Sequence, residues 1–239
     1  MHIITQGLRR ERVPTPEEAA RKSRRDFFRK TSLGLAGVGV LLTACDDDDD
    51  GGMAVDLGSG DVGVLNYAYA LEQIEAAFYA QVLSGGYYMS LGANDEERSV
   101  LEALEAHERA HKSFFEAVIP TVGTAIPALE VDFTSIDFSD RASVLGAAQT
   151  FEDLGVSAYN GAGRLLTNAD YLTLAGKIVS VEARHAAVIR DLLSDAPTAF
   201  ADDEVVDANG LDVARTPAEV LMAADTFVVT ELDASNLPS

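Results

Sequence analysis

The chain has 239 residues and a formal net charge of −21, because 39 Asp and Glu outnumber 18 Lys and Arg. An acidic surface of this kind repels phosphate backbones and anionic lipid headgroups, which excludes a nucleic-acid-binding protein. The length allows one domain with extensions, and the single cysteine excludes an intrachain disulfide.

Residues 1–44 have the pattern of an export signal rather than of a folded domain. Residues 23–30 (Ser-Arg-Arg-Asp-Phe-Phe-Arg-Lys) resemble a twin-arginine signal, and the apolar run at residues 33–44 is too short to span a bilayer as a stable helix. The run ends in Leu-Thr-Ala-Cys at residues 42–45, which resembles a lipoprotein processing box. We therefore expect lipid attachment to Cys45. The alternatives are an uncleaved N-terminal anchor and simple secretion.

These features predict export of a folded domain by the twin-arginine route and its anchoring on the outer face of the cytoplasmic membrane. Asp46, directly after the cysteine, would by resemblance favour retention at that membrane. Residues 45–60 contain a run of aspartates and several glycines, and we expect them to form a disordered tether.

Residues 61–193 carry four stretches with helical periodicity, which predicts an all-α domain. The expected helices span about residues 61–83, 94–119, 140–163 and 168–193. Asp61 is the expected N-cap of the first helix. The connection at residues 121–139 holds breaks at Gly123 and Pro127, and we interpret it as a long crossover. Such a crossover lets the second helix pair lie alongside the first in a four-helix bundle.

Residues 194–239 are expected to form a C-terminal extension. The chain becomes irregular after Pro197. Residues 216–219 (Thr-Pro-Ala-Glu) form a capping box with proline at the first helical position. This pattern predicts a short C-terminal helix that ends near Ala224.

Two Glu-x-x-His motifs are the most informative feature of the chain. They are Glu108 to His111 and Glu182 to His185, and each lies in an expected helix. Residues three apart on a helix point to the same side, so the glutamate and histidine of one motif can bind one metal ion together.

Each motif helix is preceded by a helix with a glutamate at an inward-facing position, Glu72 in the first and Glu152 in the third. The two halves form an internal repeat, because a tyrosine follows each glutamate by seven residues. These tyrosines, Tyr79 and Tyr159, have two interpretations. They either hydrogen-bond to the site or donate electrons to it, or they pack in the core with a satisfied hydroxyl.

Together these side chains predict a carboxylate-bridged site for two metal ions inside the bundle. The expected ligands are Glu72, Glu108, His111, Glu152, Glu182 and His185. Glu108 and Glu182 are expected to bridge the ions, and Glu72 and Glu152 to be terminal ligands. Without metal, four inward-facing glutamates would meet in a low-dielectric core at high cost. Oxygen and imidazole donors favour two iron or manganese ions and leave zinc open.

Three further residues lie close to the motifs. Glu75 and Glu105 are interpreted either as partners of the ligands or as exposed charges. His107 is one position away from the inward-facing row, and we expect it at the surface.

Residues 62–193 resemble the ferritin-like superfamily, and more closely the exported ferritin-like proteins related to desiccation-associated proteins. The resemblance rests on residues 70–79 (ALEQIEAAFY), on the two Glu-x-x-His motifs and on residues 216–221 (TPAEVL). It implies a ferritin-like four-helix bundle with one long crossover. The wider superfamily includes iron-storing ferritins, di-iron oxidases and manganese catalases.

Three functions follow from this resemblance. The first is a redox enzyme or oxidative-stress protein that consumes oxygen or peroxide at a dimetal centre. The second is a metal-binding or protective protein without turnover, in which the site stabilises the bundle. The third is an architectural domain without chemistry, which the complete ligand set disfavours. A homo-oligomer is compatible with the sequence, but the lipid anchor and the C-terminal extension would crowd a closed cage.

Overall fold

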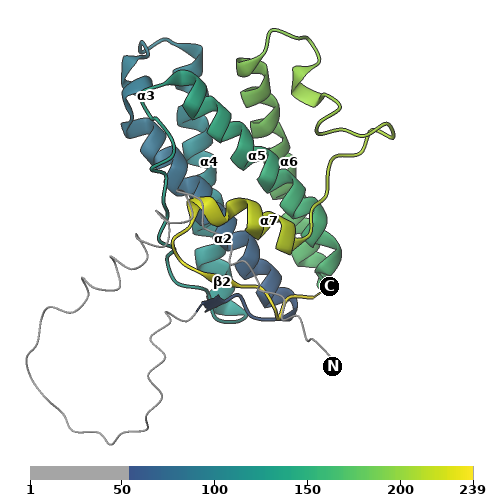
Figure 1. Cartoon of the computed structure of the whole chain (residues 1–239). Coiled ribbons are helices and arrows are strands. Elements are labelled where there is room, and N and C mark those ends of the chain that lie inside the picture. Colours follow the sequence, from purple (N-terminus) through teal and green to yellow (C-terminus); the bar gives the residue numbers. More distant parts are fainter. Residues whose placement is uncertain (1–53, 239) are drawn as a thin grey trace, which may run out of the picture. The chain divides into compact units, whose positions relative to one another are not determined.

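The structure, a computed structural model, describes residues 54–238. Its long helices are α2 (Gly60–Ser84), α4 (Glu96–Val118), α5 (Arg141–Ala162) and α6 (Ala169–Leu193), and its short ones are α3 (Gly86–Ser90) and α7 (Pro217–Ala224). The expected all-α four-helix bundle is confirmed (Figure 1). The expected export signal, Cys45 and most of the tether lie outside the described residues.

Side-chain caps begin three of the long helices. Asp95 accepts a hydrogen bond from the backbone N–H of Glu97 (3.0 Å), and Asp140 accepts one from that of Ser143 (2.8 Å). Asn168 caps α6 in the same way. Each cap satisfies a backbone donor that the first turn of a helix leaves without a partner. The local sequence therefore determines where these helices begin.

The expected role of Asp61 as the N-cap of α2 is wrong. Ser59 occupies the cap position, and Asp61 lies in the first turn of the helix. Its carboxylate accepts hydrogen bonds from the backbone N–H groups of Thr167 (2.8 Å) and Asn168 (2.9 Å). Burial acts to raise the pKa of Asp61, but these hydrogen bonds outweigh it and lower the pKa. Asp61 thus connects the start of α2 to the turn between α5 and α6.

The long helices pack as two hairpins. α2 packs mainly against α4, and α5 packs mainly against α6. The crossover between the hairpins is fixed to α2 by two buried amides. Asn66 donates to the carbonyl of Thr124 (2.9 Å), and Gln73 donates to the carbonyl of Pro127 (3.3 Å). The crossover therefore covers α2 along its length instead of looping into solvent.

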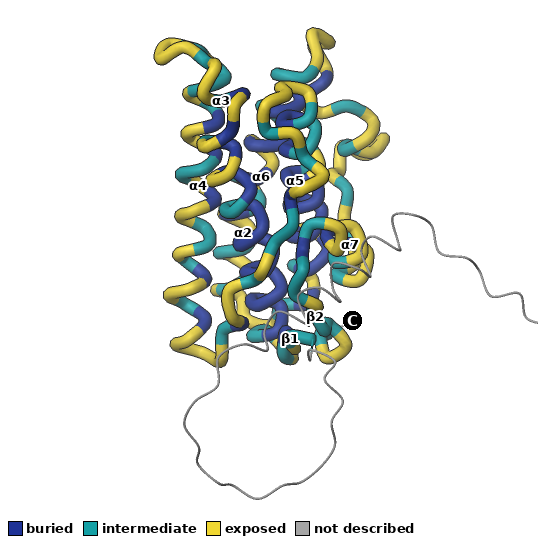
Figure 2. The backbone as a smooth tube through the Cα atoms, turned by 60° about the vertical axis from the view of Figure 1, so that its left-hand side comes forward, coloured by how far each residue is buried: buried dark blue, intermediate teal, exposed yellow. Residues whose placement is uncertain are grey.

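Burial differs between the helices of each pair. α2 and α5 are buried along most of their length, whereas α4 and α6 keep an exposed face (Figure 2). Phenylalanine rings pack together where α2 and α5 meet the crossover and the C-terminal extension, and they are Phe78, Phe133, Phe151 and Phe227. The helices that carry Glu72 and Glu152 are therefore the most enclosed.

The C-terminal extension folds back on the bundle. α7 packs against α5 (Figure 1), and its N-terminus has the expected capping box of Thr216 and Glu219. Just before α7, the backbone N–H of Arg215 donates to the carbonyl of Ser157 (3.0 Å). Gly161 faces the Arg215 backbone so closely that a Cβ would clash. A glycine on α5 therefore permits this close approach.

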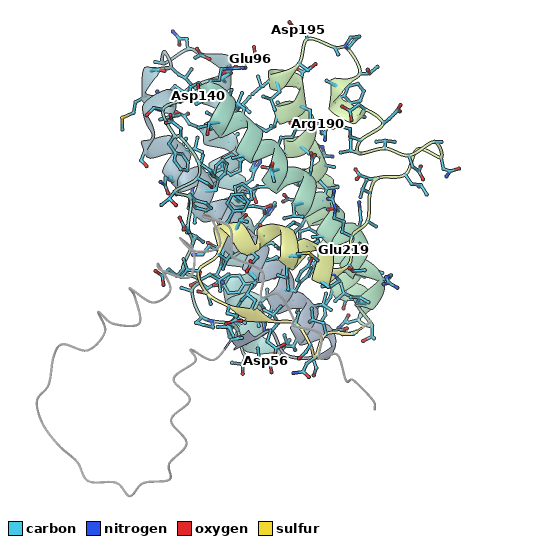
Figure 3. All side chains as sticks on the ribbon, viewed as in Figure 1. Asp56, Glu96, Asp140, Arg190, Asp195 and Glu219 are labelled. Carbon is cyan, nitrogen blue, oxygen red and sulfur yellow. The ribbon has the colours of Figure 1, made fainter. Side chains whose placement is uncertain are left out.

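Two short strands join the ends of the described chain. β1 (Val55–Asp56) pairs in parallel with β2 (Leu232–Asp233). Figure 3 labels Asp56 at the end of the bundle opposite Asp140, so the chain enters the domain where α2 begins. Between residues 54 and 238, no helix has both the length and the apolar character needed to cross a membrane.

Candidate metal centre

Each long helix contributes a fully buried carboxylate to the interior of the bundle. The four are Glu72 on α2, Glu108 on α4, Glu152 on α5 and Glu182 on α6, all 0% exposed. His111 on α4 and His185 on α6 join them, and both are largely shielded from solvent. Burying four carboxylates together costs free energy unless positive charge accompanies them.

The structure brings all six expected ligand residues together in two overlapping groups. The groups are Glu72, Glu108, His111 and Glu182, and Glu108, Glu152, Glu182 and His185. Within each group, one donor atom from every residue lies within 4.8 Å of the others. Glu108 and Glu182 belong to both groups. Each of these carboxylates can therefore offer one oxygen to each group.

Several buried donor atoms of the cluster approach one another without making hydrogen bonds. Nδ1 of His185 lies 2.8 Å from Oε1 of Glu108, yet neither atom makes a hydrogen bond with a described residue. The same is true of both oxygens of Glu182 and of Oε2 of Glu72 and Glu152. Buried polar atoms without partners are rare in folded proteins. Oxygen and imidazole donors that converge in this way fit metal cations.

Two tyrosines connect the halves of the repeat. The hydroxyl of Tyr79 on α2 donates to Oε1 of Glu152, and that of Tyr159 on α5 donates to Oε1 of Glu72, both at 2.5 Å. The second oxygen of each glutamate makes no hydrogen bond and lies 3.4 Å from a histidine Nδ1, that of His111 for Glu72 and that of His185 for Glu152. Each tyrosine therefore fixes one carboxylate oxygen and leaves the other free toward the cluster. Both hydroxyls contact the site, which was one of the two interpretations of these tyrosines.

The pKa values of the carboxylates move in opposite directions. Burial raises the pKa of Glu182 well above its usual value, and the Glu108 carboxylate adds to this shift. Burial likewise raises the pKa of Glu72 to about 7. At Glu108, contact with the two imidazoles outweighs burial and lowers the pKa to about 2. In the metal-free chain, ion pairs with the histidines therefore hold Glu108 in its charged form.

The pKa values of both imidazoles are raised, whereas that of Glu108 is lowered. Burial opposes their protonation, but the surrounding carboxylates outweigh it. The pKa of His111 rises to about 12 beside three carboxylates, and Glu108 and Glu152 raise that of His185 to about 10. An imidazole must be neutral to bind a metal, so metal ions compete with protons for these two side chains.

His107 is exposed, as expected, yet it also reaches the cluster. Its ring stacks on that of His185 with the centroids 5.1 Å apart, and its Nδ1 lies 2.9 Å from Nε2 of His185. The other nitrogen of His185 faces Glu108. His107 therefore contacts the outward nitrogen of a candidate ligand. The position of His107 on α4 predicts that it is exposed, but it does not predict which residue of α6 it contacts. The contact with His185 could therefore not be predicted from the sequence.

The structure separates the two glutamates whose role the sequence leaves open. Glu105 pairs with Arg109 on α4 at 3.0 Å. Glu75 is 4% exposed, and its carboxylate makes no hydrogen bond with the described residues. Burial and the charge of Glu182 hold the pKa of Glu75 well above its usual range. Glu75 is therefore a buried neighbour of the cluster, whereas Glu105 is an ordinary paired charge.

A family model described as a ferritin-like domain matches residues 60–195 of this chain. The matched range begins with α2 and ends just beyond α6, so it covers all six residues of the cluster. No curated protein matches the chain.

Proposed function

Because the chain belongs to the ferritin-like domain family, we propose that its buried cluster is a two-metal centre. The proposed ligands are Glu72, Glu108, His111, Glu152, Glu182 and His185. Glu108 and Glu182 are the proposed bridges. Iron and manganese are the proposed ions, since both accept mixed oxygen and imidazole ligands.

The observation that carries this proposal is the sharing of Glu108 and Glu182 by both ligand groups. Two groups with two carboxylates in common suit two adjacent cations better than one. Four carboxylates also balance the charge of two divalent ions. Metal would thus offset the cost of burying the four groups together.

We propose oxidative-stress or other redox chemistry with oxygen or peroxide as the role of this centre. Bound iron or manganese would supply the capacity to accept and donate electrons. The protein would shield the ions from water and orient their ligands. Tyr79 and Tyr159 hold the terminal glutamates, and His107 contacts the outward nitrogen of His185. Loss of such supporting contacts typically weakens metal affinity or activity about 10–100-fold.

The alternative is a non-catalytic protein in which metal only stabilises the bundle. The buried carboxylate oxygens that make no hydrogen bonds favour a large stabilising effect of metal under either function. Only turnover separates the two.

Elemental analysis and turnover assays on one preparation test the proposal. Protein loaded with ferrous or manganous ions should hold two ions per chain, one for each ligand group. The redox role predicts peroxide decomposition or ferrous oxidation by the loaded protein. Two bound ions, a raised melting temperature and neither reaction with either metal would instead support the stabilising role. A chain that binds no metal would contradict both.

We also propose twin-arginine export and lipid anchoring through Cys45. The support is the sequence alone, in which paired arginines, a short apolar run and a cysteine follow in order. In cell fractionation, Cys45→Ser should release the domain from membranes or leave an unprocessed precursor. Replacing Arg24 and Arg25 with lysine should retain the protein in the cytoplasm. Normal processing and membrane attachment of Cys45→Ser would disprove lipid anchoring.

A further inference from the structure

Glu75 is a buried carboxylate that the six-ligand site does not use. It lies three residues after Glu72 on α2, so both side chains point to the same side of the helix. Glu75 is 4% exposed and makes no hydrogen bond with the described residues. Burial, and then repulsion from all four buried glutamates of the cluster with Glu182 first among them, raises the pKa of Glu75 well above its usual range. Glu75 therefore faces the cluster without a partner of its own.

The internal repeat is broken at this position. Glu72 corresponds to Glu152, so the counterpart of Glu75 on α5 is Gly155. A Cβ at position 155 would lie 2.8 Å from Oε1 of Glu75 and 3.5 Å from Oε2 of Glu182. The glycine thus leaves the space that the Glu75 carboxylate occupies, and it places this carboxylate beside a shared glutamate of the two groups. The repeat therefore supplies a fifth buried carboxylate from α2 and none from the same position of α5.

We propose that Glu75 is a fifth carboxylate of the metal centre and favours the loss of one electron from it. Four carboxylates and two neutral imidazoles balance two divalent ions. A fifth carboxylate balances one further positive charge, which arises when one ion passes one electron to an external one-electron acceptor. The bound cations would hold Glu75 in its charged form, as they would hold the other four carboxylates, so no bond forms or breaks in this step. The inference rests on the proposed function, and it favours iron or manganese over zinc, which has no accessible trivalent state.

A mediated redox titration of the iron-loaded chain tests this role, with metal content measured on the same samples. Glu75→Gln keeps the side-chain volume and removes the charge. Glu105→Gln is the matched control, because it removes a glutamate that pairs with Arg109 on α4. We expect Glu75→Gln to lower the ratio of oxidised to reduced centre at least tenfold at a fixed potential, which is an upward shift of about 59 mV for one electron. Glu105→Gln should stay near the wild type.

Gly155→Ala is a second, independent variant. Its Cβ would displace the Glu75 carboxylate, so it should shift the titration in the same direction. Circular dichroism should show native helix content in all three variants, and Gly155→Ala decides the result if Glu75→Gln does not fold. If a variant at either position binds two ions and titrates like Glu105→Gln, Glu75 has no such role and the proposed function still stands. If the wild type takes up no metal, the proposed function itself is wrong.

Discussion

At the residue scale, two hydroxyls determine which carboxylate oxygens face the cluster. Tyr79→Phe and Tyr159→Phe keep the rings but remove the donors to Glu152 and Glu72. A buried acceptor that loses its donor costs about 1–3 kcal/mol. We therefore predict that each variant lowers the urea midpoint of the metal-free protein by a corresponding amount.

Tyr67 offers a matched control for these two variants. It is 1% exposed, and its hydroxyl makes no hydrogen bond with a described residue. Removing a buried hydroxyl without a partner leaves no acceptor unsatisfied, so Tyr67→Phe should not lower the urea midpoint. Equal midpoints for all three variants would show that the two hydrogen bonds contribute nothing to stability.

His107 should affect the metal site although it is exposed. Its contact with Nε2 of His185 orients a proposed ligand. Loss of such a supporting contact typically weakens metal affinity about 10–100-fold. We predict a loss in this range for His107→Ala by competition with a chelator of known affinity, and no loss for Arg109→Ala on the same helix. Unchanged affinity in His107→Ala would show that the contact has no positioning role.

The sequence predicted the members of the cluster better than the contacts among them. Glu108 and His111 were predictable because helical spacing alone determines that they share a side. The bond from Tyr159 to Glu72 was not, because it depends on how α5 is placed along α2. Glu75 could have been recognised from its counterpart, Gly155, because the repeat has a carboxylate at this position of one helix and no side chain at the same position of the other.

At the scale of single elements, Gly161 determines how the C-terminal extension packs on α5. A Cβ at this position would collide with the Arg215 backbone, so Gly161→Ala should displace the segment that leads into α7. We predict faster proteolysis of this segment and lower stability. Gly176→Ala is the control, because a Cβ there meets nothing within 4 Å. An exposed helical glycine replaced by alanine gains about 1 kcal/mol, so this variant should be at least as stable as the wild type. Equal proteolysis of the two variants would contradict the predicted role of Gly161.

The stability that the Asp61 carboxylate contributes, by connecting α2 to the turn before α6, should depend on pH. The pKa of Asp61 is lowered from 3.8 in the folded chain by hydrogen bonds from Thr167 and Asn168, which outweigh burial. A lowered pKa adds stability that is complete above the unfolded value and is lost as the pH falls through the folded value. Asp61→Ala should therefore lower the urea midpoint at pH 7, and the difference from wild type should shrink below pH 3.8.

Asp195→Ala provides the comparison for this pH dependence. Asp195 is exposed just beyond α6 and makes no hydrogen bond with the described residues (Figure 3). Its replacement should change the urea midpoint little at either pH. A difference between Asp61→Ala and wild type that persists unchanged into acid would mean that the carboxylate charge does not stabilise this link.

At the scale of the whole molecule, the sequence predicted the four long helices and the crossover, because periodicity and caps are local signals. It did not predict the pairing of β1 with β2, since two-residue strands carry no periodic signal. It also did not predict that α7 packs against α5. That contact depends on a glycine facing a backbone far away in the sequence, which no local pattern reveals.

Anomalous diffraction from crystals of the manganese-loaded protein tests the central claim most directly. We predict two anomalous peaks enclosed by α2, α4, α5 and α6, with Glu108 and Glu182 contacting both. One peak should also contact Glu72 and the other Glu152. The absence of any peak among these side chains, or a single peak that Glu108 and Glu182 do not share with a second, would contradict the two-metal centre.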